Sequence, residues 1–283
     1  MSPRAREILR RSQPGGFTLV ELIMGMTITS ILTMVLAGMI LAAGTAWDHT
    51  TGQEDAMQQA RSSIDRIQYM VSQAGTYKIA GQSTVPGIAV VERVNGSTRL
   101  PEVLVVWSGG TNGGMVANGL MTRLPLVQEL VIYAPRYDDP STLVEITSPA
   151  DASSIDFKSA AFSNTILTII ASNNSSKLRL SNRVHINTLS FMVGNSTSAG
   201  AVRFEMYLTP TDSELSGVVT GSAQWYSLVW AQGVASSASG MRQAGIRMEF
   251  QLEAHSASVS GSSPANAAMP FFGSASYTYV YQP

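Results

Sequence analysis

An almost wholly apolar run from Phe17 to Trp47, broken mainly by Thr, Ser and Gly, constrains this chain more than any other feature. As an α-helix that rises about 1.5 Å per residue, the run is long enough to cross a hydrocarbon core of roughly 30 Å. Arginines precede it, so the positive-inside rule predicts that residues 1–16 stay in the cytoplasm and that the rest of the chain is sent outward. The sequence therefore predicts a single-pass membrane helix over residues 17–47.

An ordinary secretory signal peptide is the competing interpretation of this run. Such a signal has a shorter apolar core and a cleavage site of small residues at its far end. Ala37, Ala42 and Ala43 offer small residues in that region. Cleavage there would release an exported protein without a membrane anchor.

Glu21 is a carboxylate inside the apolar run, five residues after Gly16. A charge in hydrocarbon is costly, so it marks function or needs a partner, unless it lies near the interface and snorkels to water. A cut after Gly16 would create such a partner, because Phe17 would then carry a new α-amine. In a bundle of related helices, Glu21 of one subunit can meet the Phe17 amine of another. A buried ion pair of this kind would set the axial register of assembly.

Residues 16–22 read GFTLVEL and resemble the cleavage and methylation motif of type IV prepilins and type II secretion pseudopilins. That motif is a glycine, then a methylated hydrophobic residue that is usually Phe, then a glutamate at the fifth mature position. Gly16, Phe17 and Glu21 match it without a gap. The resemblance implies that a prepilin peptidase cuts between Gly16 and Phe17 and methylates the Phe17 amine. It covers about the first fifth of the chain.

The same resemblance implies the partners and the compartment. The partners are the prepilin peptidase, other pilin or pseudopilin subunits, the inner-membrane assembly platform and membrane lipid. The subunit is expected first in the bacterial inner membrane, with a cytoplasmic N-terminus and a periplasmic head, and then in a filament. Gly25, Gly38 and Gly44 permit either close helix packing or local unwinding as the subunit leaves the bilayer.

Beyond Trp47 an amphipathic helix is expected to continue over residues 48–74. Apolar residues recur there at spacings of three and four, which places them on one helix face. We expect this face to pack against the sheet of the same chain and Gly75 to end the helix, because glycine carries no left-handed penalty at a C-cap. The apolar face consists of Met57, Ala60, Ile64, Ile67 and Val71.

Residues 75–283 are predicted to form a β-rich head, because short apolar runs alternate there with Gly, Ser, Asn and Pro. Apolar and polar residues alternate at 246–253, which indicates antiparallel sheet with one wet face. Tyr277, Tyr279 and Tyr281 form a one-sided aromatic stripe that favours core or cross-strand packing over sugar binding. The fold class is therefore α+β, a long N-terminal helix packed on an antiparallel head. The expected strands are 88–94, 102–107, 130–134, 143–146, 165–171, 184–193, 202–208, 227–229, 246–253 and 277–281.

The head exceeds what a compact major pilin requires, which favours a minor subunit. The run at 128–133 and the strands at 246–253 and 277–281 look similar in layout to the minor pseudopilin J and pilin W group. In type II secretion the J-type subunit joins I- and K-type subunits in a tip complex. K-type subunits usually lack the embedded glutamate, so Glu21 argues against that identity.

Charge and cysteine content give no support to other classes of partner. The whole chain carries a net charge of −1 and no cysteine. Arg4, Arg6, Arg10 and Arg11 against Glu7 give the leader +3, so the remainder carries −4. A mildly acidic protein has no general electrostatic reason to bind nucleic acid, and none is expected as a partner.

No pattern of catalytic residues supports an enzyme, and no cofactor or metal is predicted. The histidines (His49, His185, His255) lack ligand spacing. The loop 109–114 lacks the Lys-Ser/Thr of a phosphate loop, and Ser108 is not in a nucleophile elbow. Calcium binding is the alternative to solvated turns for a loose acidic group, although EF-hand spacing is missing. That group comprises Asp138, Asp139, Asp151 and Asp156.

These observations predict a structural minor pseudopilin or minor pilin, which is a type II secretion or type IV pilus subunit. The alternative is an adhesin or ligand-binding β-domain that uses the pilin-like helix only as an anchor. An enzyme fused to that anchor is a more distant third possibility. The domains expected are a leader at 1–16, a membrane and filament-core helix at 17–47, a helix extension at 48–74 and a head at 75–283.

Overall fold

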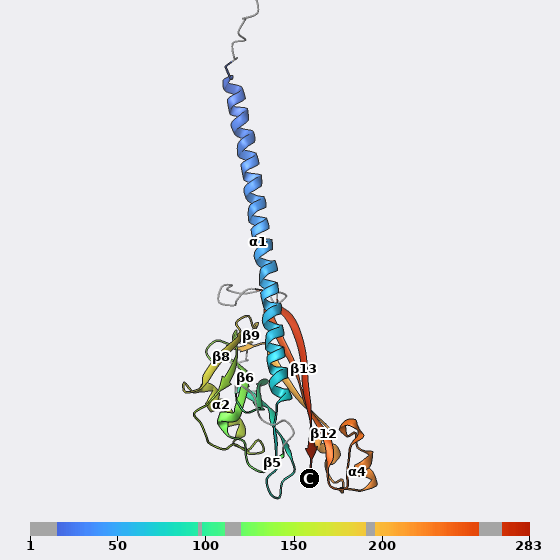
Figure 1. Cartoon of the computed structure of the whole chain (residues 1–283). Helices are drawn as coiled ribbons and strands as arrows, with labels where there is room; N and C mark the ends of the chain where they lie inside the picture. The colour runs from blue at the N-terminus through green and yellow to red at the C-terminus, as the bar shows by residue number, and fades with distance from the viewer. Residues whose placement is uncertain (1–15, 96–97, 111–119, 191–195, 255–267) are drawn as a thin grey trace, which may run out of the picture. The chain divides into compact units, whose positions relative to one another are not determined.

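A computed structural model describes residues 16–95, 98–110, 120–190, 196–254 and 268–283. Contacts divide the chain into two compact units, Met1–His49 and Thr50–Pro283. The fold class is α+β: a long apolar helix near the N-terminus and a β-rich remainder made of mostly antiparallel sheets (Figure 1).

Helix α1 (Leu19–Ser72) begins in the first unit, and every residue described there is exposed. It is the one helix in the described part of the chain that is long and apolar enough to cross a membrane, a property that a signal sequence near the N-terminus shares. The hydroxyl groups in its apolar part form hydrogen bonds within the helix. The side chains of Thr27, Thr29, Ser30 and Thr33 each donate to the carbonyl four residues earlier, at 2.7–2.8 Å. Polar groups bonded in this way are compatible with hydrocarbon surroundings.

The second unit contains two larger antiparallel sheets. The order of the five-stranded sheet is β3-β4-β6-β7-β8, and that of the three-stranded sheet is β11-β12-β13. The strands of the first are β3 (Ile88–Asn95), β4 (Thr98–Trp107), β6 (Leu130–Pro135), β7 (Leu143–Thr147) and β8 (Ser176–Ser181). Those of the second are β11 (Val202–Thr209), β12 (Gly240–Glu253) and β13 (Ala268–Tyr281).

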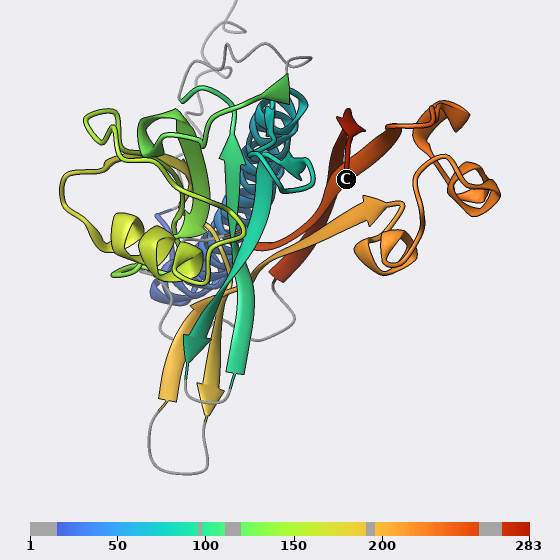
Figure 2. The same ribbon diagram turned by 90° about the horizontal axis from the view of Figure 1, so that it is seen from below.

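Smaller elements complete this unit. A three-stranded sheet has the order β2-β1-β5, in which β1 and β5 are parallel, and β9 pairs antiparallel with β10. Figure 2 shows α2 (yellow-green) on one side of the large sheet. The segment between β11 and β12 (orange), which contains α3 and α4, lies on the other side. The elements are β1 (Thr76–Tyr77), β2 (Val85–Pro86), β5 (Leu120–Met121), η2 (Val127–Glu129), α2 (Phe162–Ala171), β9 (Ile186–Ser190), β10 (Ser196–Gly200), α3 (Asp212–Leu215), α4 (Ala223–Ser227) and η3 (Ala231–Gly233).

The five-stranded sheet is buried on both faces, because successive side chains in a strand point to opposite sides. In β4, Leu104 and Val106 join a core with the second part of α1 and the three-stranded sheet. Val103, Val105 and Trp107 join a separate core with α2 and the short strands. Two covered faces explain why β4 and β6 read as nearly continuous apolar runs and not as alternating ones.

The three-stranded sheet has one wet face, as the alternation at 246–253 predicts. Ile246, Met248 and Phe250 are buried, whereas Arg247 is exposed. Glu253 departs from the pattern, since it is buried at the end of β12 beside His185. The aromatic stripe packs as expected: the side chains of Tyr277, Tyr279 and Tyr281 belong to the core that contains α1.

The amphipathic stretch of α1 packs on the sheets of its own unit, as expected, but on a slightly different face. Ala60, Ile67 and Val71 are fully buried and Ile64 is partly buried, whereas Met57 is exposed. Four small or flexible residues that the prediction omitted complete the buried face. They are Gly52, Ala56, Ser63 and Met70.

Two predicted strands and one predicted cap are wrong. Residues 165–171 lie in helix α2, where Phe162, Ile166 and Ile169 recur at helical spacing and are buried against the large sheet. Residues 227–229 form no strand: Ser227 is the last residue of α4, and residues 228 and 229 belong to neither a helix nor a strand. Gly75 is not among the glycines with positive φ, so the end of α1 does not use a left-handed glycine. The predicted strand 184–193 is shorter, as β9 ends at Ser190, and 191–193 lie outside the described residues.

Candidate functional site

The N-terminus of α1 is closed by a reciprocal pair of hydrogen bonds between Thr18 and Glu21. Glu21 Oε2 accepts from the backbone N–H and from the hydroxyl of Thr18, both at 2.9 Å. The Glu21 N–H donates to Thr18 Oγ1 at 3.3 Å. This arrangement is a capping box, which satisfies N–H groups that the first helical turn leaves without partners. It also places a negative charge at the positive end of the helix dipole.

Gly16 and Phe17 precede the capping box and are open to the surroundings. Phe17 has 87% of its surface exposed, and Gly16 is exposed as well. A Cβ atom built on Gly16 would have no atom within 4 Å. The peptide bond between these two residues therefore has no cover from the rest of the described chain.

Glu21 lies at the head of a face of small side chains on α1. Gly25, Thr29, Thr33 and Ala37 follow it at intervals of four residues, so all five lie along one side of the helix. An open groove runs along this face and is lined by Phe17 and Glu21 at its start. Faces of small residues let two membrane helices approach closely.

The structure describes two of the three histidines. His49 is exposed on α1, while His185 Nδ1 lies 2.5 Å from Glu253 Oε1 at the end of β12. His255 lies outside the described residues. No group of three or more His, Cys, Asp or Glu side chains that could hold a metal ion occurs in the described ranges.

The acidic residues proposed as a calcium alternative are each engaged by near neighbours. Asp138 accepts both hydrogen bonds of the Arg136 guanidinium, which lowers the pKa of that carboxyl. Asp151 accepts from the hydroxyl and N–H of Ser153, and these bonds lower its pKa. Asp156 accepts from the hydroxyl of Tyr77 at 2.8 Å, and Asp139 accepts from two hydroxyls of its own turn.

The glycine-rich loop and Ser108 also have local structural roles. Gly109 and Gly110 both have φ of 87° and both donate to the carbonyl of Glu129 at 3.0 Å. Residues 111–114 lie outside the described residues. Ser108 is fully buried, with its hydroxyl 3.4 Å from the sulfur of Met70.

Buried charged contacts, which the sequence did not predict, fasten the helix to the sheets of the second unit. Arg66 on α1 donates through Nε and Nη2 to Glu145 on β7, both at 2.8 Å. Tyr133 donates to the same carboxylate, and burial followed by the charge of Glu145 raises the pKa of Tyr133 well above its usual value. The hydroxyl therefore remains a donor at neutral pH. Such bidentate, hydrogen-bonded pairs add geometric specificity.

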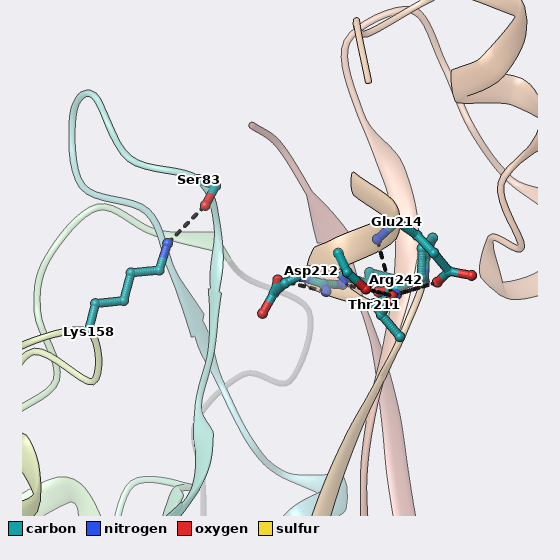
Figure 3. A network of polar contacts seen from close by, with 8 residues as sticks. Ser83, Lys158, Thr211, Asp212, Glu214 and Arg242 are labelled. Atoms are coloured by element: carbon teal, nitrogen blue, oxygen red, sulfur yellow. Dashed lines mark hydrogen bonds and ion pairs between the residues drawn. The ribbon is translucent and has the colours of Figure 1, made fainter. Parts of the chain in front are cut away.

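A second polar network holds the segment 210–239, which connects β11 to β12. The Arg242 side chain, only 2% exposed, donates to the Pro210 carbonyl at 2.7 Å and to Asp212 at 2.8 Å. Figure 3 shows Arg242 beside the Thr211–Glu214 capping box and, apart from them, Lys158 donating to Ser83. The contacts of Arg242 have a structural role in positioning α3.

Comparisons with protein-family models, with curated proteins and with solved structures find no match for this chain. The functional conclusion therefore depends on the chemistry of the N-terminal segment and on the geometry above.

Proposed function

We propose that this protein is a structural subunit of the prepilin type, a minor pseudopilin or minor pilin. The observation that carries the proposal is the segment 16–22, in which a Gly-Phe bond precedes an apolar helix with one embedded glutamate. The accessible Gly16–Phe17 bond and the self-satisfied hydroxyls of the apolar helix support it. The subunit is inserted in the membrane, cut after Gly16 and methylated on Phe17 by a prepilin peptidase.

Assembly then depends on Glu21. Both bonds from Thr18 end on Oε2, so Oε1 is left for a donor from another molecule. The α-amine of a neighbouring subunit's first residue supplies that donor and a positive charge. The small side chains at Gly25, Thr29 and Thr33 let the neighbouring helix approach on the same face as Glu21. A charge pair removed from water tolerates little axial slippage, which fixes the register.

Processing by a prepilin peptidase tests this proposal. The full chain is expressed in bacterial membranes with and without a co-expressed prepilin peptidase, and its mass is measured. We expect wild type to lose residues 1–16 only when the peptidase is present. Gly16→Leu should keep the leader, because a bulky side chain blocks recognition of the bond.

The change at Gly16 meets no atom of the described residues within 4 Å, so retention of the leader would report on the peptidase and not on folding. Gly38→Leu is the matched control, since its Cβ also meets no atom within 4 Å, and it should be processed like wild type. Wild type that keeps its leader beside an active peptidase would refute the proposal.

A further inference from the structure

A small pocket beside strand β8 gathers positive charge. It has a volume of about 250 Å³ and is bounded by β7, β8 and the turn that precedes β7. Because one water occupies roughly 30 Å³ in the liquid, the pocket has room for about eight waters. Its lining includes Arg136, Asp139, Val144, Lys177, Arg179 and Asn182.

Strand geometry explains why two cations share this pocket. Lys177 and Arg179 are two residues apart in β8, so their side chains leave the same face of the strand. A register shift between Leu143 and Val144 interrupts the pairing of β7 with β8 next to Arg179. The irregularity bends the strand locally, as β-bulges do.

The charges around the pocket are unevenly paired. Arg136 is neutralised by two hydrogen bonds to Asp138, at 2.6 and 2.8 Å. Among the described residues, Lys177 and Arg179 make no ion pair or hydrogen bond through their side chains, although the charge of Lys177 does lower the pKa of Asp138. Two cations are thus left without a bonded anion in an otherwise acidic chain.

Asp139 is the one carboxylate in the lining, and its oxygens are turned to its own loop. Oδ1 accepts from the Ser141 hydroxyl at 2.5 Å, and Oδ2 accepts from the Thr142 hydroxyl at 2.7 Å. Burial alone would raise the pKa of Asp139. The hydrogen bonds from Ser141 and Thr142 and the charge of Arg136 outweigh this effect, so the pKa lies below its usual value and the carboxyl stays ionised at neutral pH. Its oxygens accept from the groups of its own turn, and among the described residues it forms no ion pair with Lys177 or Arg179.

Protection of a sheet edge explains only part of this arrangement. β8 is the last strand of its sheet, and natural edge strands often carry Lys or Arg to discourage pairing with other chains. Lys177 and Arg179 are both exposed, so they can serve that function. Edge protection does not require them to line one hollow together with Arg136 and an amide side chain, Asn182.

We propose that the pocket between Arg136, Lys177 and Arg179 binds an oxyanion, the phosphate or carboxylate group of a small polar ligand. The planar guanidinium of Arg179 suits two oxygens at once, and Lys177 adds a point charge. The volume exceeds that of one phosphate ion, so it also accommodates part of the molecule that carries the anion. The pocket lies wholly within Thr50–Pro283, so the proposal is independent of the N-terminal segment.

Calorimetric titration of the full chain in detergent micelles tests this site, with inorganic phosphate and galacturonate as separate probes at constant ionic strength. We expect saturable binding in the millimolar range or tighter for at least one probe. Tighter binding of phosphate would identify a phosphorylated ligand, and tighter binding of galacturonate a carboxylated one.

Arg179→Gln should weaken the binding at least about tenfold, the loss expected for one charge-assisted hydrogen bond. Arg61→Gln is the matched control, because Arg61 is an exposed arginine on α1 that does not line the pocket, and it should bind like wild type. Both residues are exposed, so an unchanged unfolding temperature confirms that the variants fold. Absence of saturable binding of both probes, or equal weakening in both variants, would overturn the proposal.

Discussion

At the residue scale, Glu21 combines a capping role that the geometry shows with a pairing role that we propose. Its Oε2 closes the capping box with Thr18, whereas the proposed ion pair requires the negative charge of the side chain. The two roles depend on different properties, hydrogen-bond acceptance and charge. Substitutions at two positions can therefore separate them.

Glu21→Gln and Glu21→Ala should both insert in the membrane normally but should both enter filaments poorly. Glutamine can still accept from the Thr18 N–H in a capping box, yet it carries no charge to pair with an amine. Thr18→Val removes the capping hydroxyl and keeps the charge of Glu21, so it should assemble nearly as well as wild type. To measure how much of each variant enters filaments, the filaments are sheared from the cells. Crosslinking of the variant to neighbouring subunits is then quantified in that fraction.

The opposite pattern would contradict the pairing role. If Glu21→Gln assembles like wild type while Thr18→Val fails, Glu21 acts as a helix cap and sets no register. A capping box has the sequence signature Ser/Thr-x-x-Glu, which residues 18–21 match. The cap was therefore predictable from the sequence, whereas pairing with another subunit depends on contacts outside this chain.

At the element scale, α1 and the end of β12 approach each other closely at Gly52. A Cβ on Gly52 would lie 2.2 Å from the carbonyl oxygen of Ala254. Arg183 reinforces the contact, because its guanidinium donates to the Ala254 carbonyl and to Asp55 on the helix. Only glycine allows this backbone approach.

Gly52→Ala should destabilise the protein by about 1–2 kcal/mol. Alanine improves intrinsic helix propensity by up to about 1 kcal/mol, but overpacking costs typically about 1–3 kcal/mol, and a backbone carbonyl cannot rotate away. Denaturant unfolding of the full chain in micelles, followed by tryptophan fluorescence, measures the change. Trp107, Trp225 and Trp230 are buried and report on the second unit.

Gly44→Ala is the control for helix propensity, because a Cβ there meets no atom within 4 Å. It should leave the unfolding midpoint of the second unit unchanged or slightly raised. A Gly52→Ala protein as stable as wild type would show that the helix and the end of β12 are less tightly joined.

Elements that carry a clear period were predictable from sequence, and ambiguous short runs were not. The alternation at 246–253 and the apolar runs in β4 and β6 led to strands that the structure contains. The run 165–171 is apolar and β-branched, so local propensity favours a strand, but packing against the large sheet selects a helix. The two-residue strands β1, β2 and β5 carry no periodic signal.

At the scale of the whole molecule, sequence predicted the class of fold but not which strands pair. The α+β class follows from the long apolar helix and the β-rich remainder. Both larger sheets follow the order of the chain, β3-β4-β6-β7-β8 and β11-β12-β13, whereas the ion pair between Arg66 and Glu145 joins residues that are 79 positions apart. A single sequence contains no local pattern that specifies a distant contact such as the Arg66–Glu145 ion pair.

The N-terminal segment alone connects this molecule to its proposed function, so the chemistry at Phe17 tests the proposal most directly. The measurement is intact mass and N-terminal sequence of the protein recovered from its native membranes. We predict a chain that begins at Phe17 and carries one methyl group on its α-amine. A chain that keeps residues 1–16, or one cut beyond Ala42, would contradict assignment to the prepilin class.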